Sequence, residues 1–233
     1  MSCKISIVIP VYNEALIVNQ SIQSLITQLQ MSKVKDLWQI ILVENGSTDN
    51  TYDQLKALSS ENISIIQLKK PNYGSALKTG IFSAKTDYIY TFNIDYWDIS
   101  FIEKTLPLFE KNSIIIGSKG LPCSSDLRPL YRRLSTRIFV FLLKILFNYT
   151  LHDTHGIIAW KKKDIMEIYK KTRCFREIFD TALILTCMRK GLSVTEISVE
   201  VKEIRPSRSF FLYRAIKACV SLVLLRFDLW LDS

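Results

Sequence analysis

The stretch TDYIYTFNID, residues 86–95, is the starting point for reading this chain. β-Branched and aromatic residues fill it and polar residues bound it, which is typical of a buried strand. Asn93 and Asp95 stand at its carboxyl end, where an open α/β sheet binds its ligands. Their oxygen atoms suit a hard cation such as Mg²⁺ or Mn²⁺, which in turn holds a diphosphate. A strand that ends in Asn or Asp is more commonly followed by a plain turn, so this pattern needs support from the rest of the chain.

Apolar runs of the same kind precede this strand, and a helical pattern follows each of them. Predicted strands lie at 5–10, 40–43 and 63–68, and predicted helices lie at 17–29, 52–58 and 75–84. We expect Asn13 to cap the first helix and Ser47 or Asp49 to cap the second. Because short turns join strand and helix, the pattern predicts an α/β fold with a mostly parallel central sheet and helices on both faces.

The second half of the chain is less regular. Its predicted helices lie at 99–109, 128–147, 164–170 and 178–188, and its predicted strands lie at 113–116, within 152–160 and at 192–199. Neither GxGxxG after the first strand nor GxxxxGK[ST] occurs. The sequence therefore argues against a dinucleotide-binding fold and a P-loop fold.

The C-terminal segment, residues 210–233, predicts an amphipathic helix. Its narrow polar face would carry Arg214, Lys217, Ser221, Asp228 and Asp232. Two interpretations stay open. The helix closes the core of the domain with its wide apolar face, or it lies in a membrane interface or against a membrane protein, with Trp230 as an anchor.

Composition limits the partners and the compartment. The 233 residues carry a net charge of +9, and such a surface serves nucleic acid, an anionic membrane or phosphorylated substrates. No nucleic-acid-binding motif occurs, so nucleic acid ranks last. The five cysteines are scattered, which favours free thiols in a reducing compartment. No cleavable signal and no long uncharged apolar run are evident, so the sequence predicts a cytoplasmic protein.

Nine segments together resemble one known family. They are SIVIPVYNE (6–14), VENGSTDNT (43–51), KPNYGSALKTG (70–80), FNID (92–95), GSK (117–119), YRRLS (131–135), HDTHG (152–156), FDTALI (179–184) and EIRPSRS (203–209). In this order they resemble glycosyltransferase family 2, the inverting enzymes of the GT-A fold. The similarity is greatest to the group of dolichol-phosphate mannose synthases and polyprenyl-phosphate glycosyltransferases.

The resemblance implies a GT-A catalytic domain at 1–205, followed by a basic loop and an amphipathic helix at 206–233. It implies transfer of a hexose from GDP-mannose or a UDP-sugar to a polyprenyl or dolichyl phosphate, by a protein peripheral on the cytosolic face of a membrane. Two alternatives stay open: a family 2 enzyme with a sugar or protein hydroxyl acceptor, and a catalytically degenerate scaffold that binds a membrane partner.

The resemblance also implies a donor site. Its nucleotide-sugar residues would be Pro10, Tyr12, Glu14, Glu44, Asn45, Gly74, Asn93, Asp95, Arg205 and Arg208. Asn93 and Asp95 would hold Mg²⁺ or Mn²⁺, and Lys78 would reach the diphosphate. Two positions depart from the family, since Asn93 and Asn45 stand where it usually has acids. The first removes one negative charge from the metal site, so metal affinity should be weaker or depend more on the diphosphate. The second leaves guanine and uracil both open as the base.

The acceptor side is implied by a basic helix start and an acidic turn. Arg128, Arg132, Arg133 and Ser135 would bind the acceptor phosphate, because arginine binds phosphate through two parallel hydrogen bonds. Asp153 would lie behind the attacking oxygen. A phosphate acceptor is mostly dianionic at neutral pH, so Asp153 would position it more than deprotonate it. The alternative without function is that the three arginines form a solvated basic face and that Lys78 is a solvated surface lysine.

Overall fold

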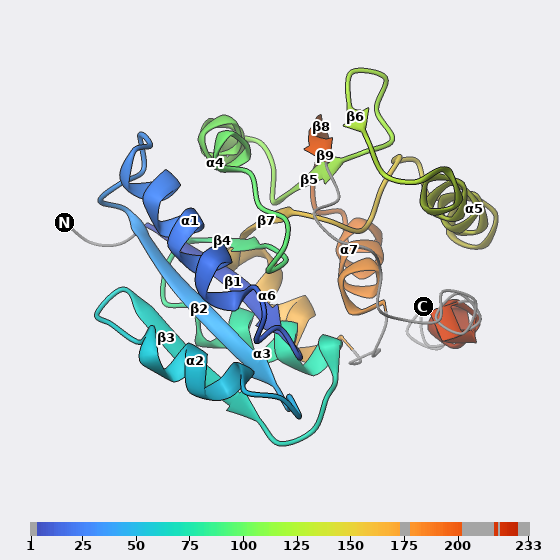
Figure 1. Ribbon diagram of the computed structural model, residues 1–233. Coiled ribbons are helices and arrows are strands. Elements are labelled where there is room, and N and C mark those ends of the chain that lie inside the picture. Colours follow the sequence, from blue (N-terminus) through green and yellow to red (C-terminus); the bar gives the residue numbers. More distant parts are fainter. Residues whose placement is uncertain (1–3, 173–177, 202–216, 219, 228–233) are drawn as a thin grey trace.

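The computed structural model describes residues 4–172, 178–201, 217–218 and 220–227 (Figure 1). The first half contains β1 (Ile5–Val11), α1 (Val18–Gln30), β2 (Trp38–Asn45), α2 (Thr51–Ala57), β3 (Ile63–Leu68), α3 (Tyr73–Ser83) and β4 (Tyr88–Thr91). The second half contains α4 (Ile99–Thr105), the short 3₁₀ helix η1 (Pro107–Glu110), β5 (Ile114–Ser118), β6 (Ser125–Asp126), α5 (Leu130–Phe147), β7 (Ile158–Lys161), α6 (Lys162–Lys171), α7 (Phe179–Arg189), β8 (Val194–Ser198) and β9 (Glu200–Val201).

The central sheet has seven strands in the order β3-β2-β1-β4-β7-β5-β8. All pairs are parallel except those of β7, which runs antiparallel to both β4 and β5. The predicted mostly parallel α/β sheet is therefore confirmed. β6 and β9 form a separate two-stranded parallel ladder that the sequence did not predict. Since β2, β1 and β4 are adjacent and parallel, the loops after them leave the same edge of the sheet.

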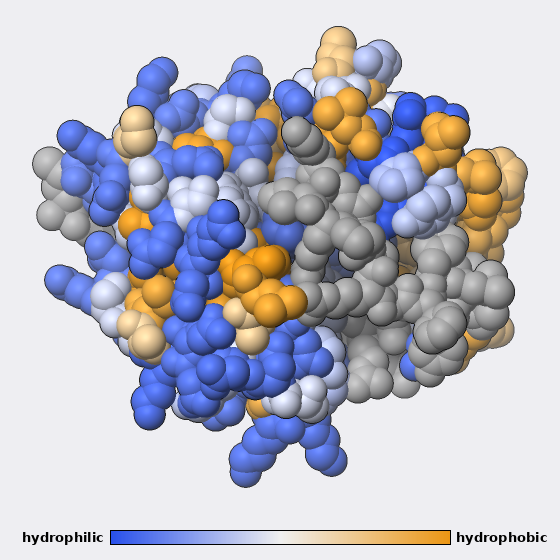
Figure 2. Space-filling view, in the orientation of Figure 1, coloured by the Kyte–Doolittle hydropathy of each residue, from blue (hydrophilic) through white to orange (hydrophobic). Residues whose placement is uncertain are grey.

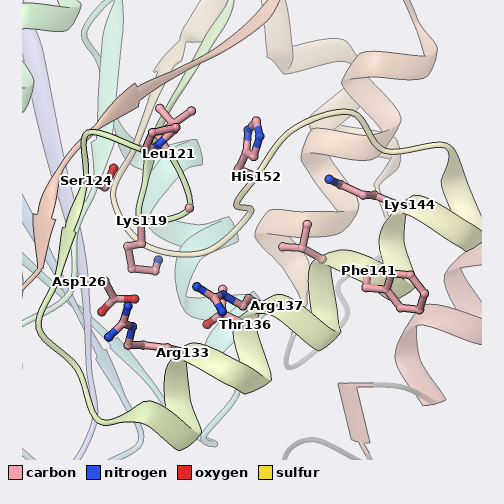
Figure 3. Close-up of a pocket in the computed structure, with 13 residues that line it drawn as sticks. Lys119, Leu121, Ser124, Asp126, Arg133, Thr136, Arg137, Phe141, Lys144 and His152 are labelled. Atoms are coloured by element: carbon pink, nitrogen blue, oxygen red, sulfur yellow. The ribbon is translucent and has the colours of Figure 1, made fainter.

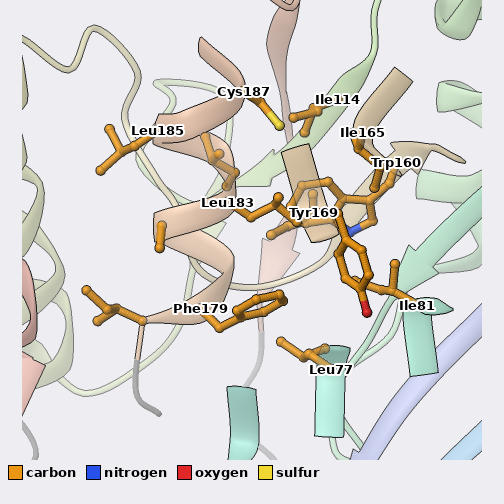
Figure 4. Packing of buried hydrophobic residues seen from close by; sticks show 14 of the residues in the cluster. Leu77, Ile81, Ile114, Trp160, Ile165, Tyr169, Phe179, Leu183, Leu185 and Cys187 are labelled. Atoms are coloured by element: carbon orange, nitrogen blue, oxygen red, sulfur yellow. The ribbon is translucent and has the colours of Figure 1, made fainter. Parts of the chain in front are cut away.

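Each face of the sheet has its own apolar core, because successive side chains of a strand point to opposite faces. Residues such as Ile7 and Leu42 pack with α1, α2 and α4, whereas Val8 and Val43 pack with α3, α6 and α7. Figure 4 shows the second cluster, in which Trp160 and Tyr169 lie among aliphatic side chains. With both faces covered, the polar loops at the strand ends are left for ligands.

Several predicted caps were wrong. α1 begins at Val18 after Ile17, which makes no side-chain cap. Asn13 instead takes a left-handed conformation with φ 55° and binds the next loop. Neither Ser47 nor Asp49 is the cap residue of α2, which begins after Asn50. Asn13 and Ser47 bond across loops, a long-range use that local pattern does not show. Asp49 accepts both from Ala15 N in the other loop and from Thr51 N at the start of α2.

The predicted helix at 99–109 is also shorter than expected. α4 ends at Thr105, and a 3₁₀ turn follows from Pro107. Proline has no backbone N–H to continue the α-helical ladder, so the helix stops before it.

The predicted C-terminal helix is described only in part, at 217–218 and 220–227. Leu222 and Leu225 are buried in the same cluster as Leu143 of α5, so one side of the segment closes the core. The rest of the predicted helix lies outside the described residues. In the part of the chain that the structure describes, no helix is long and apolar enough to span a membrane.

Candidate active site

Several hydrogen bonds join the loop after β1 to the segment after β2, and the three shortest of them involve backbone N–H groups. Asn13 Oδ1 accepts from the N–H of Thr48 at 2.8 Å, and Ser47 Oγ accepts from the N–H of Asn13 at 3.0 Å. Thr51 Oγ1 accepts from the N–H of Glu14 at 2.7 Å. Of the predicted donor residues, Pro10 lies near the end of β1 and Tyr12 and Glu14 lie on the loop that follows, which its neighbour holds in place. Tyr12 is exposed and Glu14 is buried.

The end of β2 is fixed in the same way. Glu44 Oε1 accepts from the N–H of Ser47 at 2.5 Å, and Asn45 Oδ1 accepts from the N–H of Asn72 at 2.7 Å. Gly46, in the loop after β2, has φ 71°, and a Cβ there would meet the backbone of Lys70, in the loop after β3, at 3.0 Å. Only glycine fits this close approach without strain. Asn72 in turn caps α3 by accepting from Ser75 N, and the predicted Gly74 is buried in the first turn of that helix.

The predicted metal residues lie in a tight turn after β4. Asn93 and Tyr96 exchange two backbone hydrogen bonds of 3.2 Å, which places Asp95 within the turn. Asp98 caps α4 by accepting from Phe101 N at 3.2 Å. The described residues contain no group of three or more acidic, His or Cys side chains that could hold a metal on its own. One carboxylate and one amide fit a cation that takes its other ligands from a diphosphate and water.

Asp95 also borders a groove of about 710 Å³ between the turn after β4 and helix α1. The groove is lined in addition by Trp97, by Ser24 of α1 and by Glu200 of β9. Asp95 thus borders this groove and follows β4 at the same edge of the sheet as the loops after β1 and β2.

Lys78 is held against α6. Its ammonium donates to the carbonyl of Thr172 at 3.0 Å and lies 5.5 Å from the centre of the Tyr169 ring. The hydroxyl of Tyr169 donates back to the carbonyl of Lys78. The structure therefore shows Lys78 joining α3 to α6, and its contact with a diphosphate stays a prediction.

Asp153 is buried and fully bonded. Its Oδ2 lies 2.7 Å from the Lys119 ammonium and accepts from Lys119 N at 3.1 Å. Its Oδ1 accepts from the N–H groups of Thr154 and His155 at 2.8 and 3.0 Å. Burial alone would raise the pKa of Asp153, but Lys119 and these donors outweigh it, so the pKa lies below its ordinary value. Such a carboxylate is suited to holding the loop, not to accepting a proton.

Two more buried carboxylates surround this turn. Burial raises the pKa of Asp180 even though His155 Nε2 lies 3.7 Å from its Oδ1. Asp180 also accepts from Thr181 N at 2.9 Å in the first turn of α7. Glu196 of β8 accepts from His152 Nδ1 and from the N–H groups of His152 and Asp153, all at 2.9 Å. Glu196 was not among the predicted site residues.

A cavity of about 540 Å³ opens between α5 and this turn (Figure 3). Its cationic lining comes from Lys119, Arg133, Arg137 and Lys144, and its other lining residues include Leu121, Asp126, Val140, Phe141 and His152. Figure 3 shows Arg133, Arg137 and Lys144 on α5, facing the loop that carries Lys119. The cavity therefore joins several positive charges to apolar walls.

The four residues predicted to bind the acceptor phosphate are not equivalent. Only Arg133 is among the residues that line the cavity. Arg128 forms two 2.8 Å hydrogen bonds with the carboxylate of Asp126, and Ser135 Oγ donates to the carbonyl of Arg132 within the helix at 2.8 Å. Sequence reasoning missed Arg137 and Lys144 as cavity residues, although Arg137 lies one helical turn from Arg133. Arg205 and Arg208 lie outside the described residues.

Comparisons with known proteins show the family of the chain. The model of the family "Glycosyl transferase family 2" matches residues 6–169. A dolichyl-phosphate beta-glucosyltransferase of Dictyostelium discoideum is 24% identical over 96% of this chain and 74% of its own length. An undecaprenyl-phosphate 4-deoxy-4-formamido-L-arabinose transferase of Yersinia enterocolitica is 39% identical over 70% of this chain and 50% of its own.

Solved structures show the same fold. Glucosyl-3-phosphoglycerate synthase of Mycobacterium tuberculosis, in complex with Mn²⁺, UDP and its product, matches with a TM-score of 0.67. The match covers 96% of this chain and 80% of that one at 17% identity. The predicted GT-A fold and the resemblance to the polyprenyl-phosphate group are thus confirmed. With a family model that matches more than half of its residues, this chain is a glycosyltransferase and belongs to glycosyl transferase family 2.

Proposed function

We propose that this protein transfers glucose from UDP-glucose to a polyprenyl phosphate of the dolichyl type, as a peripheral protein on the cytosolic face of a membrane. The observation that carries the proposal is the α5 cavity, which combines cations with apolar walls beside the Asp153 turn. Relatives named for dolichyl-phosphate glucosyl transfer support the acceptor and the sugar. The UDP complexes of the structural neighbours support uracil as the base.

The cavity suits a lipid phosphate better than a neutral hydroxyl acceptor. Arg133 and Arg137 can together hold a phosphate by charge-assisted hydrogen bonds. Val140, Phe141 and Leu121 can cover the first isoprene units, since apolar side chains favour a hydrocarbon ligand. Lys119 is already paired with Asp153, so Arg133, Arg137 and Lys144 would supply the positive charge of the cavity.

The donor would lie at the strand ends. Glu14, Glu44 and Asn45 would surround the nucleotide, and Asn93 and Asp95 would hold Mg²⁺ or Mn²⁺ together with the diphosphate. The cation would neutralise the charge that the departing diphosphate gains. Lys78, Arg205 and Arg208 would add positive charge on the same side.

The residues of the acceptor side would position the reaction without removing a proton. The phosphate of a monoester has a second pKa of about 6, so its oxygen is already a nucleophile at neutral pH. Asp153 and Lys119 would fix the turn that faces this oxygen, so that attack on the anomeric carbon is in line with the leaving UDP.

A labelled-donor assay tests the proposal. The full chain is incubated with Mn²⁺, labelled UDP-glucose and a short, water-soluble prenyl phosphate, and labelled product is separated from the donor by chromatography and counted. GDP-mannose is the rival donor, and the rival acceptors are 3-phosphoglycerate and the matching prenyl alcohol. We expect transfer only from UDP-glucose to the prenyl phosphate. Transfer to the alcohol would favour the hydroxyl-acceptor alternative, and no transfer in any combination would contradict enzymatic activity of this class.

A further inference from the structure

Helix α5 carries an apolar row that faces away from the domain. Leu130, Leu134, Ile138, Phe141 and Ile145 are each more than half exposed, at 77%, 59%, 52%, 61% and 62%. Their spacing of three or four residues puts them on one stripe of the helix, about 22 Å long at 1.5 Å per residue. We call these five residues the α5 stripe. Figure 2 shows hydrophobic side chains gathered at the edge where Figure 1 places α5.

A second apolar row lies on the C-terminal helical segment. Leu222 and Leu225 are buried with Leu143 of α5, which ties this segment and α5 to one apolar cluster. Val220 and Phe227 of the same segment are more than half exposed. Both elements therefore pack inward with one side and leave apolar side chains outside. An isolated exposed leucine needs no explanation, but a continuous row of this length marks an interaction surface.

The charges beside the α5 stripe and its position next to the cavity indicate what binds it. Arg137 and Lys144 are exposed and flank the α5 stripe on the side of the cavity. Phe141 belongs to the stripe and also lines the cavity, so the two are continuous. An apolar stripe bordered by cations is typical of a helix that lies in the interface of an anionic bilayer.

We propose that the α5 stripe, together with the exposed side of the C-terminal segment, docks on the surface of an anionic lipid bilayer and opens the cavity toward the lipid. The inference rests on the proposed function, because an acceptor held in the bilayer must bring its phosphate to the protein from that side. Arg133 and Arg137 would then lie at the level of the lipid phosphates, with the isoprene chain still in the membrane.

Vesicle flotation of the full chain tests the docking surface. The vesicles are pure phosphatidylcholine or contain about 30 mol% phosphatidylglycerol, which supplies the negative charge. The test variant is Leu134→Ser/Ile138→Ser, because neither residue lines the cavity. The matched control is Leu16→Ser/Met31→Ser, whose residues are more exposed, at 83% and 84%, and lie in the first half of the chain.

We expect the wild type and the control to bind the anionic vesicles and the stripe variant to lose about 30-fold or more in affinity, since two half-exposed aliphatic side chains no longer enter the lipid. All three should transfer equally well to the water-soluble prenyl phosphate. Equal binding by all three proteins, or no binding by the wild type, overturns the proposal. A wild-type dimer in light scattering that the stripe variant converts to a monomer assigns the stripe to a second copy instead. If vesicles bind as expected but no transfer occurs, the proposed function fails and the docking surface stands.

Discussion

Replacement of Asp153 by Asn measures how much the buried ion pair between Lys119 and Asp153 contributes to the stability of the proposed acceptor side. The side chains of Asp153 and Lys119 are 1% and 7% exposed, so neither charge has water to replace its partner. In the variant the amide can still accept from the N–H groups of Thr154 and His155 through its oxygen. Its NH₂ group, however, would face the ammonium and N–H of Lys119, which are also donors.

The magnitude follows from the burial. Removing one partner of a buried pair leaves an uncompensated charge and costs about 3–5 kcal/mol. Against a typical total stability of about 5–15 kcal/mol, this is a large loss. The double variant Lys119→Met/Asp153→Asn removes both charges and should recover most of it, because replacing the whole pair by groups of similar volume is often nearly neutral.

Urea denaturation followed by tryptophan fluorescence measures these differences. We expect the wild type and the double variant to be close and Asp153→Asn to unfold at clearly lower urea. Because the pKa of Asp153 is depressed in the folded state, its contribution is present above the unfolded value of about 3.9 and is lost as the pH falls through the folded value. The difference should therefore persist through neutral and mildly acidic pH. A single variant within about 1 kcal/mol of the wild type would refute this account.

Further predictions concern the core, the cavity and two other carboxylates. Gly80→Ala should destabilise the protein by about 1–3 kcal/mol in urea, because its Cβ would meet Val8 Cγ1 at 2.3 Å, and Val8→Ala in the same chain should relieve the clash. Arg137→Ala should raise KM for the prenyl phosphate by about 10- to 100-fold without changing KM for the donor; equal changes in both would argue against an acceptor contact. Asp180→Asn should raise the melting temperature at neutral pH, since burial raises the pKa of Asp180 and its ionised form is disfavoured in the folded state; the gain should shrink as the pH falls toward about 3.9. Asp95→Ala should abolish the Mn²⁺-dependent part of the thermal stabilisation by UDP, and an unchanged shift would place the cation elsewhere.

Much of the fold could be predicted because the spacing of apolar residues within short segments indicates where strands and helices lie. The alternation of short apolar runs with helical patterns fixed the parallel half of the sheet, and the predicted turn at Asn93 and Asp95 does follow a strand of that sheet. The direction of β7 could not be predicted, since antiparallel insertion between β4 and β5 depends on partners far away in the sequence. Strand propensity alone carries no information about direction.

The donor and acceptor sides of the site differ in how far their parts lie from one another in the chain. On the predicted donor side each loop follows a strand whose place in the sheet local pattern predicts, so the positions of these loops follow from the strands, and their contact with a donor stays a prediction. On the predicted acceptor side, Lys119 in the loop after β5 and Glu196 of β8 contact the His152 turn although they are 34 and 43 residues away from Asp153 in the sequence. Arg128 is the contrasting case, because its partner Asp126 is only two residues away in the sequence. Arg128 is paired with this carboxylate and is not among the residues that line the cavity. Charge composition therefore located a basic helix correctly but could not tell which of its arginines are already neutralised. Ion pairs within the protein decide which arginines keep their charge for a ligand, and these arginines would set the selectivity of the cavity for an anionic lipid.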